Sequence, residues 1–92
     1  MGGNTRMAAV AATGVHLASY RVVVNARRGW DQLTRRNGDL LRGLRADIRR
    51  VDVGVKAVIY ALFAVPVTSA AAAAELCRKL RLRGVFCEPE NS

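Results

Sequence analysis

A run without any charged side chain most constrains what this chain can fold into. It extends from Ala57 to Ala74, whereas the segments 21–56 and 75–90 on either side carry a charge every few residues. An uncharged run of about 18 residues is near the lower limit for a helix that crosses a bilayer. A helix over Val53–Leu76 would be about 36 Å long, which exceeds a hydrocarbon core of about 30 Å. The segment 53–76 is therefore predicted to be a single transmembrane helix.

The composition of this segment predicts a membrane helix that packs against neighbours. Pro66 lies near its middle and predicts a kink, which membrane helices tolerate when neighbouring groups satisfy the freed carbonyl. The residues after Pro66 are mostly small, and small residues allow a second helix to approach closely. The predicted helix-packing positions are Ala70, Ala71, Ala73 and Ala74.

The segment 15–52 shows the periodicity of an amphipathic helix. At 100° per residue its apolar side chains fall within an arc of about 100°, and its charged side chains fall outside that arc. The apolar set is Val15, Val22, Val23, Ala26, Trp30, Leu33, Leu40, Leu41, Leu44, Ile48, Val51 and Val55. The turn-forming pair Asn37-Gly38 leaves two alternatives, one long helix with a weak point or two helices with Asp39 as the second N-cap.

These patterns predict an all-α chain: a long amphipathic helix, or a helix pair, leading into one transmembrane helix, without an independent globular domain. Residues 1–14 resemble a mitochondrial presequence, since no acidic residue precedes Trp30. Residues 77–92 form a tail that is first basic and then acidic.

The net charge of +8 indicates an anionic partner. Basic residues flank the uncharged run on both sides, as expected for contact with lipid headgroups or with acidic subunits. The sequence lacks the interleaved aromatic residues of a base-stacking surface, so nucleic acid is not the expected partner. The predicted contact residues are Arg42, Arg45, Arg49, Arg50, Lys56, Arg78, Lys79 and Arg81.

Two cysteines, Cys77 and Cys87, form a C-x₉-C pair. The spacing resembles half of the twin C-x₉-C pattern of small mitochondrial intermembrane-space proteins. Cysteines ten residues apart face different directions on a straight helix, so a disulfide requires a bend near Gly84. Unpaired thiols are the expectation, and the disulfide is the alternative.

No catalytic motif, cofactor site or metal-ligand spacing is present in the sequence, and His16 is the only histidine. The chain is therefore predicted not to be an enzyme. It resembles, at the level of class, the small single-span accessory subunits of mitochondrial energy-transducing complexes such as ATP synthase or the respiratory chain.

That resemblance implies a structural subunit of the mitochondrial inner membrane. Its partners would be larger membrane subunits and an anionic phospholipid such as cardiolipin. Two alternatives remain, namely a basic helical RNA-associated protein of the ribosomal type and a surface-active peptide that acts on anionic membranes.

Overall fold

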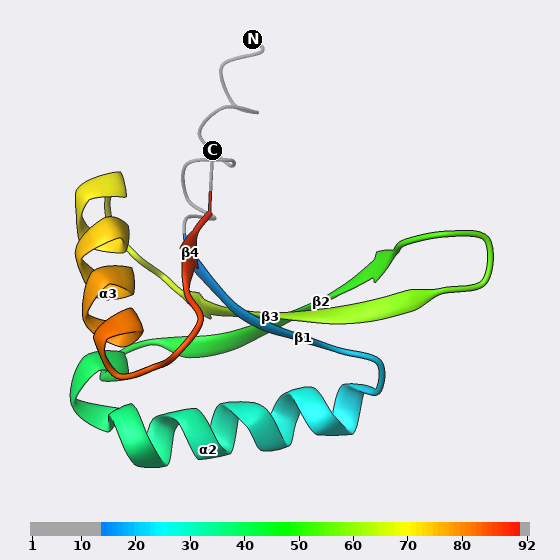
Figure 1. The fold of residues 1–92 in the computed structure, drawn as a ribbon, viewed down its shortest axis with the longest axis horizontal. Coiled ribbons are helices and arrows are strands. Elements are labelled where there is room, and N and C mark those ends of the chain that lie inside the picture. The colour runs from blue at the N-terminus through cyan, green and yellow to red at the C-terminus, as the bar shows by residue number, and fades with distance from the viewer. Residues whose placement is uncertain (1–13, 91–92) are drawn as a thin grey trace, which may run out of the picture.

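Four strands and two helices make up the described part of the chain, residues 14–90 of the computed structural model. They follow one another as β1 (Val15–Tyr20), α2 (Val23–Leu41), β2 (Arg45–Asp52), β3 (Val58–Val65), α3 (Ala70–Leu82) and β4 (Glu88–Pro89). The strands form one antiparallel sheet in the order β2-β3-β1-β4 (Figure 1). This succession of elements is the split β-α-β, or ferredoxin-like, arrangement.

The prediction of a transmembrane helix over 53–76 is wrong. Its residues form the tip of the β2–β3 hairpin, strand β3, a short connection and the first half of α3. Within residues 14–90, no helix is both long enough and apolar enough to cross a membrane. The predicted single-pass location in the mitochondrial inner membrane is corrected for the same reason.

The residue types within the uncharged run explain why it forms a strand and then a helix rather than one long helix. Val58–Val65 is rich in β-branched and aromatic residues, which favour a strand, and it pairs with a neighbour on both sides. Pro66 lies in the connection after β3 rather than at a helix kink. Ser69 then caps α3, because its hydroxyl accepts a hydrogen bond of 3.0 Å from the Ala72 amide.

The all-α prediction is also wrong for the segment 15–52, in which only Val23–Leu41 is helical. Strand β2 alternates between Arg45, Asp47 and Arg49 on one face and Ala46 and Ile48 on the other, as a half-covered strand does. Two helical segments meet at the predicted weak point Asn37-Gly38 and together make up α2. Asn37 has non-helical dihedral angles (φ −129°, ψ 33°) inside α2, so the helix is kinked there.

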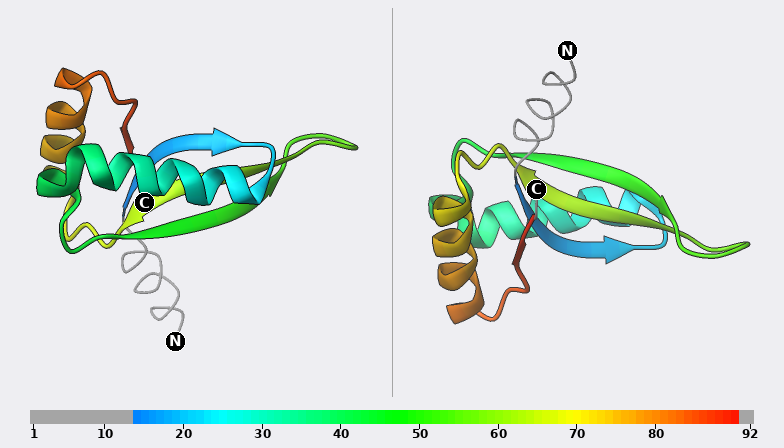
Figure 2. Two further views of the ribbon diagram at one scale, coloured as in Figure 1. Left: turned by 90° about the horizontal axis from the view of Figure 1, so that it is seen from below. Right: turned by 90° about the horizontal axis from the view of Figure 1, so that it is seen from above.

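Both helices contribute to a single core on one face of the sheet. Val15 and Ala64 from the sheet meet Leu41 of α2 and Leu80 of α3 in this core, and each of these side chains is almost fully buried. Helix α2 lies along the sheet and α3 lies at one end of it (Figure 2). Neither helix lies over the opposite face of the strands, which we call the open face.

Truncation of the central strand tests this core. Leu62 is fully buried in β3, so Leu62→Ala should lower the free energy of unfolding by about 2–5 kcal/mol. Leu82→Ala is the matched control, because Leu82 is 76% exposed and its truncation should cost under about 0.5 kcal/mol. Urea unfolding followed by circular dichroism measures both, and equal effects would contradict the fold.

An ion pair joins the ends of the two helices. Arg83 donates hydrogen bonds of 2.6 and 2.9 Å to the Asp39 carboxylate and one of 3.2 Å to Asn37 Oδ1. The hydrogen bonds from Arg83 lower the pKa of Asp39 from 3.8 to about 2. The folded chain therefore binds this proton more weakly than the unfolded chain does.

The pH dependence of this pair is a second prediction. Its stabilisation is present above pH 4 and is lost as the pH falls toward 2, because the lowered pKa belongs to the folded state. Asp39→Asn should therefore lower the Tm at pH 6 and have a much smaller effect at pH 2. Asp31→Asn is the control, since Asp31 is exposed on α2 and forms no ion pair within residues 14–90. A constant difference across the pH range would exclude this role.

Candidate functional site

A β-bulge in β1 determines which side chains reach the open face. His16 pairs with Phe63, Ala18 pairs with Leu62, and Leu17 is the extra residue between them. Because paired residues of antiparallel strands share a face, the bulge brings both His16 and Ser19 to the open face. Leu17 meanwhile stays buried in the core.

Three rings form a row across the open face, which we call the aromatic row: Phe63, His16 and Phe86. The His16 ring centroid lies 5.0 Å from that of Phe63 and 5.6 Å from that of Phe86. The row thus crosses β3, β1 and the segment that leads into β4. Phe86 is 55% exposed, so the row presents ring surface to a ligand.

A guanidinium group extends the aromatic row onto β2. Arg49 lies 3.7 Å from the Phe63 ring centroid, within cation–π range. It donates 2.6 and 3.2 Å hydrogen bonds to Glu90 and one of 2.9 Å to Asp47. The hydrogen bonds to Glu90 raise the pKa of Arg49. Because Glu90 follows the strand at the opposite edge of the sheet, this ion pair reaches across the open face and fixes Arg49 above Phe63.

The polar groups on this face suit binding rather than nucleophilic catalysis. His16 Nε2 lies 3.0 Å from the Ala18 carbonyl oxygen and 3.1 Å from Ser19 Oγ. A carbonyl oxygen only accepts, so this contact requires a proton on Nε2. That nitrogen then cannot take the proton of the Ser19 hydroxyl, and the hydrogen bonds hold the ring in place instead.

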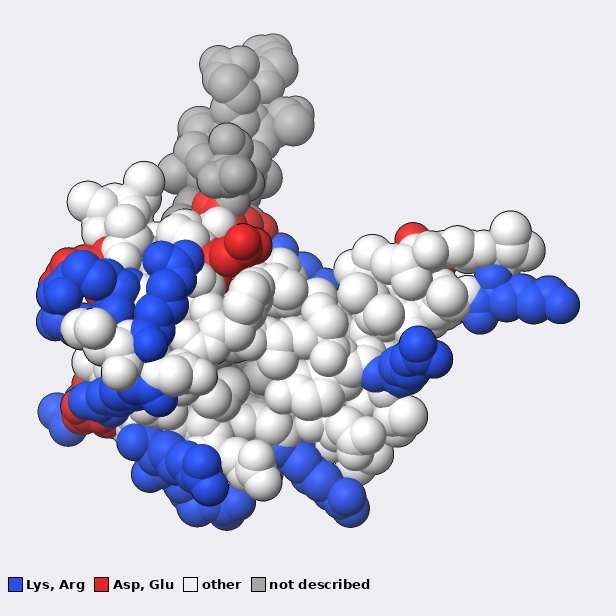
Figure 3. All heavy atoms as spheres, in the orientation of Figure 1, with Lys and Arg blue, Asp and Glu red and all other residues white. Residues whose placement is uncertain are grey.

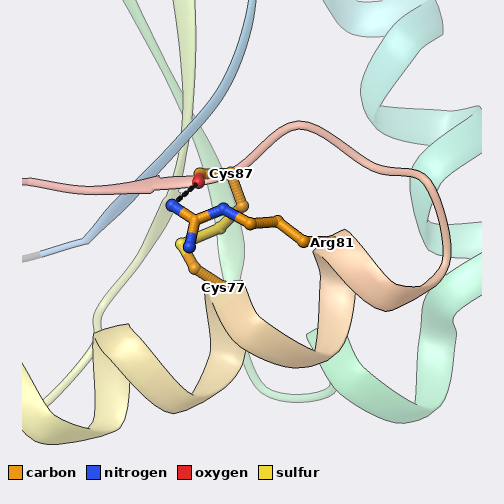
Figure 4. The surroundings of a disulfide bond; sticks show 3 residues. All are labelled: Cys77, Arg81 and Cys87. Atoms are coloured by element: carbon orange, nitrogen blue, oxygen red, sulfur yellow. Dashed lines mark hydrogen bonds between the residues drawn. A yellow bond between two sulfur atoms is a disulfide. The ribbon is translucent and has the colours of Figure 1, made fainter.

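A disulfide between Cys77 and Cys87 fixes the end of the aromatic row (Figure 4). Unpaired thiols, which the sequence led us to expect, are not what the structure contains. Helix α3 ends at Leu82, and Gly84 has a positive φ of 80°, so the chain turns back toward the helix. Arg81 also donates a hydrogen bond to the Cys87 carbonyl. Phe86 and Glu88, on either side of Cys87, are thereby held at the open face.

The predicted contact residues lie on several surfaces rather than on one. Arg45 and Arg49 share the open side of β2, Arg50 is near the end of that strand, and Lys56 is at the hairpin tip. Arg42 follows α2, and Arg78 and Lys79 pair with Glu75 on α3. Of the predicted packing alanines, Ala73 is buried in the core, whereas Ala70, Ala71 and Ala74 are exposed.

Sequence reasoning missed most of the candidate site. Phe63 was assigned to the transmembrane helix, and His16 was treated as an isolated polar residue. Phe86 and Glu90 were assigned to an irregular tail. The signal that could have found them is the alternation in β2 and the short β-branched run of β3, which together predict a sheet with one polar face.

Comparison of the chain with models of protein families, with curated proteins and with solved structures finds no match. Function is therefore argued from the geometry of the open face.

Removal of the disulfide should loosen the end of the site. The bond closes a loop between residues ten apart, and such a loop contributes about 2–3 kcal/mol to the free energy of unfolding. The double variant Cys77→Ala/Cys87→Ala should lose about this amount in urea unfolding. The Glu90 amide, which donates to the Gly14 carbonyl, should also exchange its hydrogen faster.

Reductant supplies the control for this experiment. It should destabilise the wild-type chain and leave the double variant unchanged. Equal stability of the wild type with and without reductant would show that the bond does not hold this segment.

Proposed function

We propose that this chain is a non-catalytic binding module whose open face binds a saccharide chain in an oxidising compartment. The observation that carries the proposal is the aromatic row on an uncovered sheet face, with a fixed guanidinium at one end and carboxylates beside it. Three features support it: the shape of the surface, its charge and the disulfide.

The shape of the open face suits flat rings. The C–H groups on one side of a pyranose ring form an apolar surface with a weakly positive edge. This surface packs on the negative face of an aromatic ring. Phe86 is 55% exposed and offers a ring face to a sugar, whereas the Arg49 guanidinium already covers a face of Phe63. A sugar ring would therefore stack on Phe86, and the next rings of the chain would lie against His16 and the Arg49–Phe63 pair.

The charge of the open face favours a hydroxyl-rich ligand over a polyphosphate. Asp47 and Glu90 pair with Arg49, and Glu88 lies opposite His16 on the same face. These carboxylates accept hydrogen bonds from sugar hydroxyl or amide groups. The acidic residues Asp47, Glu88 and Glu90 outnumber the arginines of this face, Arg45 and Arg49, so the face offers little net attraction to a polyphosphate.

The disulfide favours a location outside a reducing cytosol. Structural disulfides persist in oxidising environments such as secreted proteins, the periplasm and cell surfaces. Both cysteines are fully buried and the bond is part of the core, as expected of a structural bridge. Polysaccharides are abundant in these same environments.

Single-stranded RNA is the second candidate. Aromatic side chains on two adjacent central strands, here His16 on β1 and Phe63 on β3, form a surface on which bases can stack. The net charge of +8 would attract phosphates. The carboxylates on the open face and the disulfide oppose this function. The accessory-subunit hypothesis has no membrane span within residues 14–90 to support it.

Sedimentation with insoluble polysaccharides tests the proposal. Cellulose, chitin and purified bacterial cell-wall sacculi are the probes, and a single-stranded oligonucleotide serves as the RNA comparison. The wild-type chain should sediment with at least one polysaccharide. Phe63→Leu should weaken that binding about tenfold or more, because it removes the ring that Arg49 and His16 both contact at the centre of the row. Binding to the oligonucleotide alone would exclude the saccharide.

Two further variants separate ring stacking from folding. Phe63→Tyr retains the ring and should retain binding. Tyr60→Phe alters the opposite face of the same strand, toward Tyr20 and α2, and should leave binding unchanged. Phe63→Leu approximately conserves apolar volume, so its Tm should stay close to that of the wild type. Undiminished sedimentation of a folded Phe63→Leu chain would refute the site.

A further inference from the structure

A second surface lies along the outer edge of β1, separate from the centre of the open face. Strand β4 pairs with β1 only at Val15 and His16, so within residues 14–90 no strand pairs with the outer edge of β1 from Leu17 to Tyr20. Figure 2 shows β1 continuing well beyond the end of β4. The Ala18 carbonyl accepts a hydrogen bond from His16, and another chain can bind the other backbone N–H and C=O groups of this edge.

A groove lies beside this free edge. It has a volume of about 480 Å³ and lies between β1, helix α2 and the segment from Arg83 to Phe86. Leu33 and Val85, which pack against the core, contribute apolar surface. Tyr20 contributes a ring, and Arg36 contributes a cation.

The two edges of the sheet differ in the charge of their side chains. The outer edge of β2 carries Arg45, Asp47, Arg49 and Arg50, and charged side chains are a usual defence against edge pairing. The free part of β1, Leu17–Tyr20, carries no charge. Figure 3 shows that the centre of this side of the molecule is uncharged, with Lys and Arg side chains at the left, below and at the right of it and acidic side chains above it and at the left.

We propose that the free edge of β1 docks an extended peptide of a partner protein, which adds a strand to the sheet. The backbone of the peptide would pair with Leu17–Tyr20, and every second side chain would enter the groove. The peptide carries apolar residues at alternate positions and an acidic residue opposite Arg36. Arg36 is available for this contact, because it forms no ion pair with any residue in 14–90.

The positive charge of Arg36 indicates that the peptide carries an acidic residue. The second arginine of the groove, Arg83, is already bound to Asp39 and Asn37, so Arg36 is the groove cation that remains to pair with a ligand. An acidic side chain at Arg36 also fixes the direction and register of the added strand, which backbone pairing alone does not specify.

Panning a phage library of random octapeptides against the full chain tests the proposal. Enriched peptides should alternate apolar residues and contain an acidic one. Synthetic copies should slow hydrogen exchange at backbone amides within Leu17–Tyr20. Arg36→Glu should weaken their binding about tenfold or more, and Arg35→Glu is the matched control. Arg35 is the exposed neighbour on α2 outside the groove, and its variant changes the net charge equally.

Three outcomes would overturn the proposal. The first is a library that yields no enriched peptide, and the second is a set of peptides that bind Arg36→Glu as well as wild type. The third is protection of the Leu17–Tyr20 amides by self-association, seen as concentration-dependent dimers in sedimentation velocity without peptide. Because saccharide sedimentation is measured separately, Phe63→Leu should retain peptide binding and Arg36→Glu should retain polysaccharide binding. Failure of one proposal is thus distinguishable from failure of the other.

Discussion

Burial of only one face of the sheet is the constraint on which the structure depends. Val15, Leu62 and Ala64 are fully buried, and both helices supply the side chains that help to cover this face. Within residues 14–90 neither α2 nor α3 lies over the other face. The open face can therefore carry rings and charges that no core would accept.

The disulfide compensates for a short C-terminal strand. β4 contributes only two residues, which is little for fixing the segment that carries Phe86 and Glu90. Cys87 lies within this segment and is tied to the middle of α3, while Glu90 is tied to Arg49 across the sheet. One covalent and one ionic link thus position residues that backbone pairing alone would hold weakly.

The sequence predicted helix throughout 15–52, of which only Val23–Leu41 is helical, and it did not predict the sheet. Leu44, Ile48, Val51 and Val55 happen to continue the 100° phase of that helix, although they lie in or beside β2. The uncharged run contains both strand β3 and the first half of helix α3. Hydropathy did not separate them, because a short apolar strand and a buried helix have similar hydropathy. The contact between Arg49 and Glu90 could not be predicted, because it joins residues 41 positions apart that only the sheet order brings together.

The bulge at Leu17 divides β1 into two parts, and the alternation of side chains between the core and the open face is shifted by one residue between them. Up to His16 odd-numbered residues face the core, and from Ala18 onward even-numbered residues do. Without the extra residue, His16 and Ser19 would lie on opposite faces of the strand. The bulge thus makes possible the 3.1 Å contact between His16 Nε2 and Ser19 Oγ while Leu17 remains in the core.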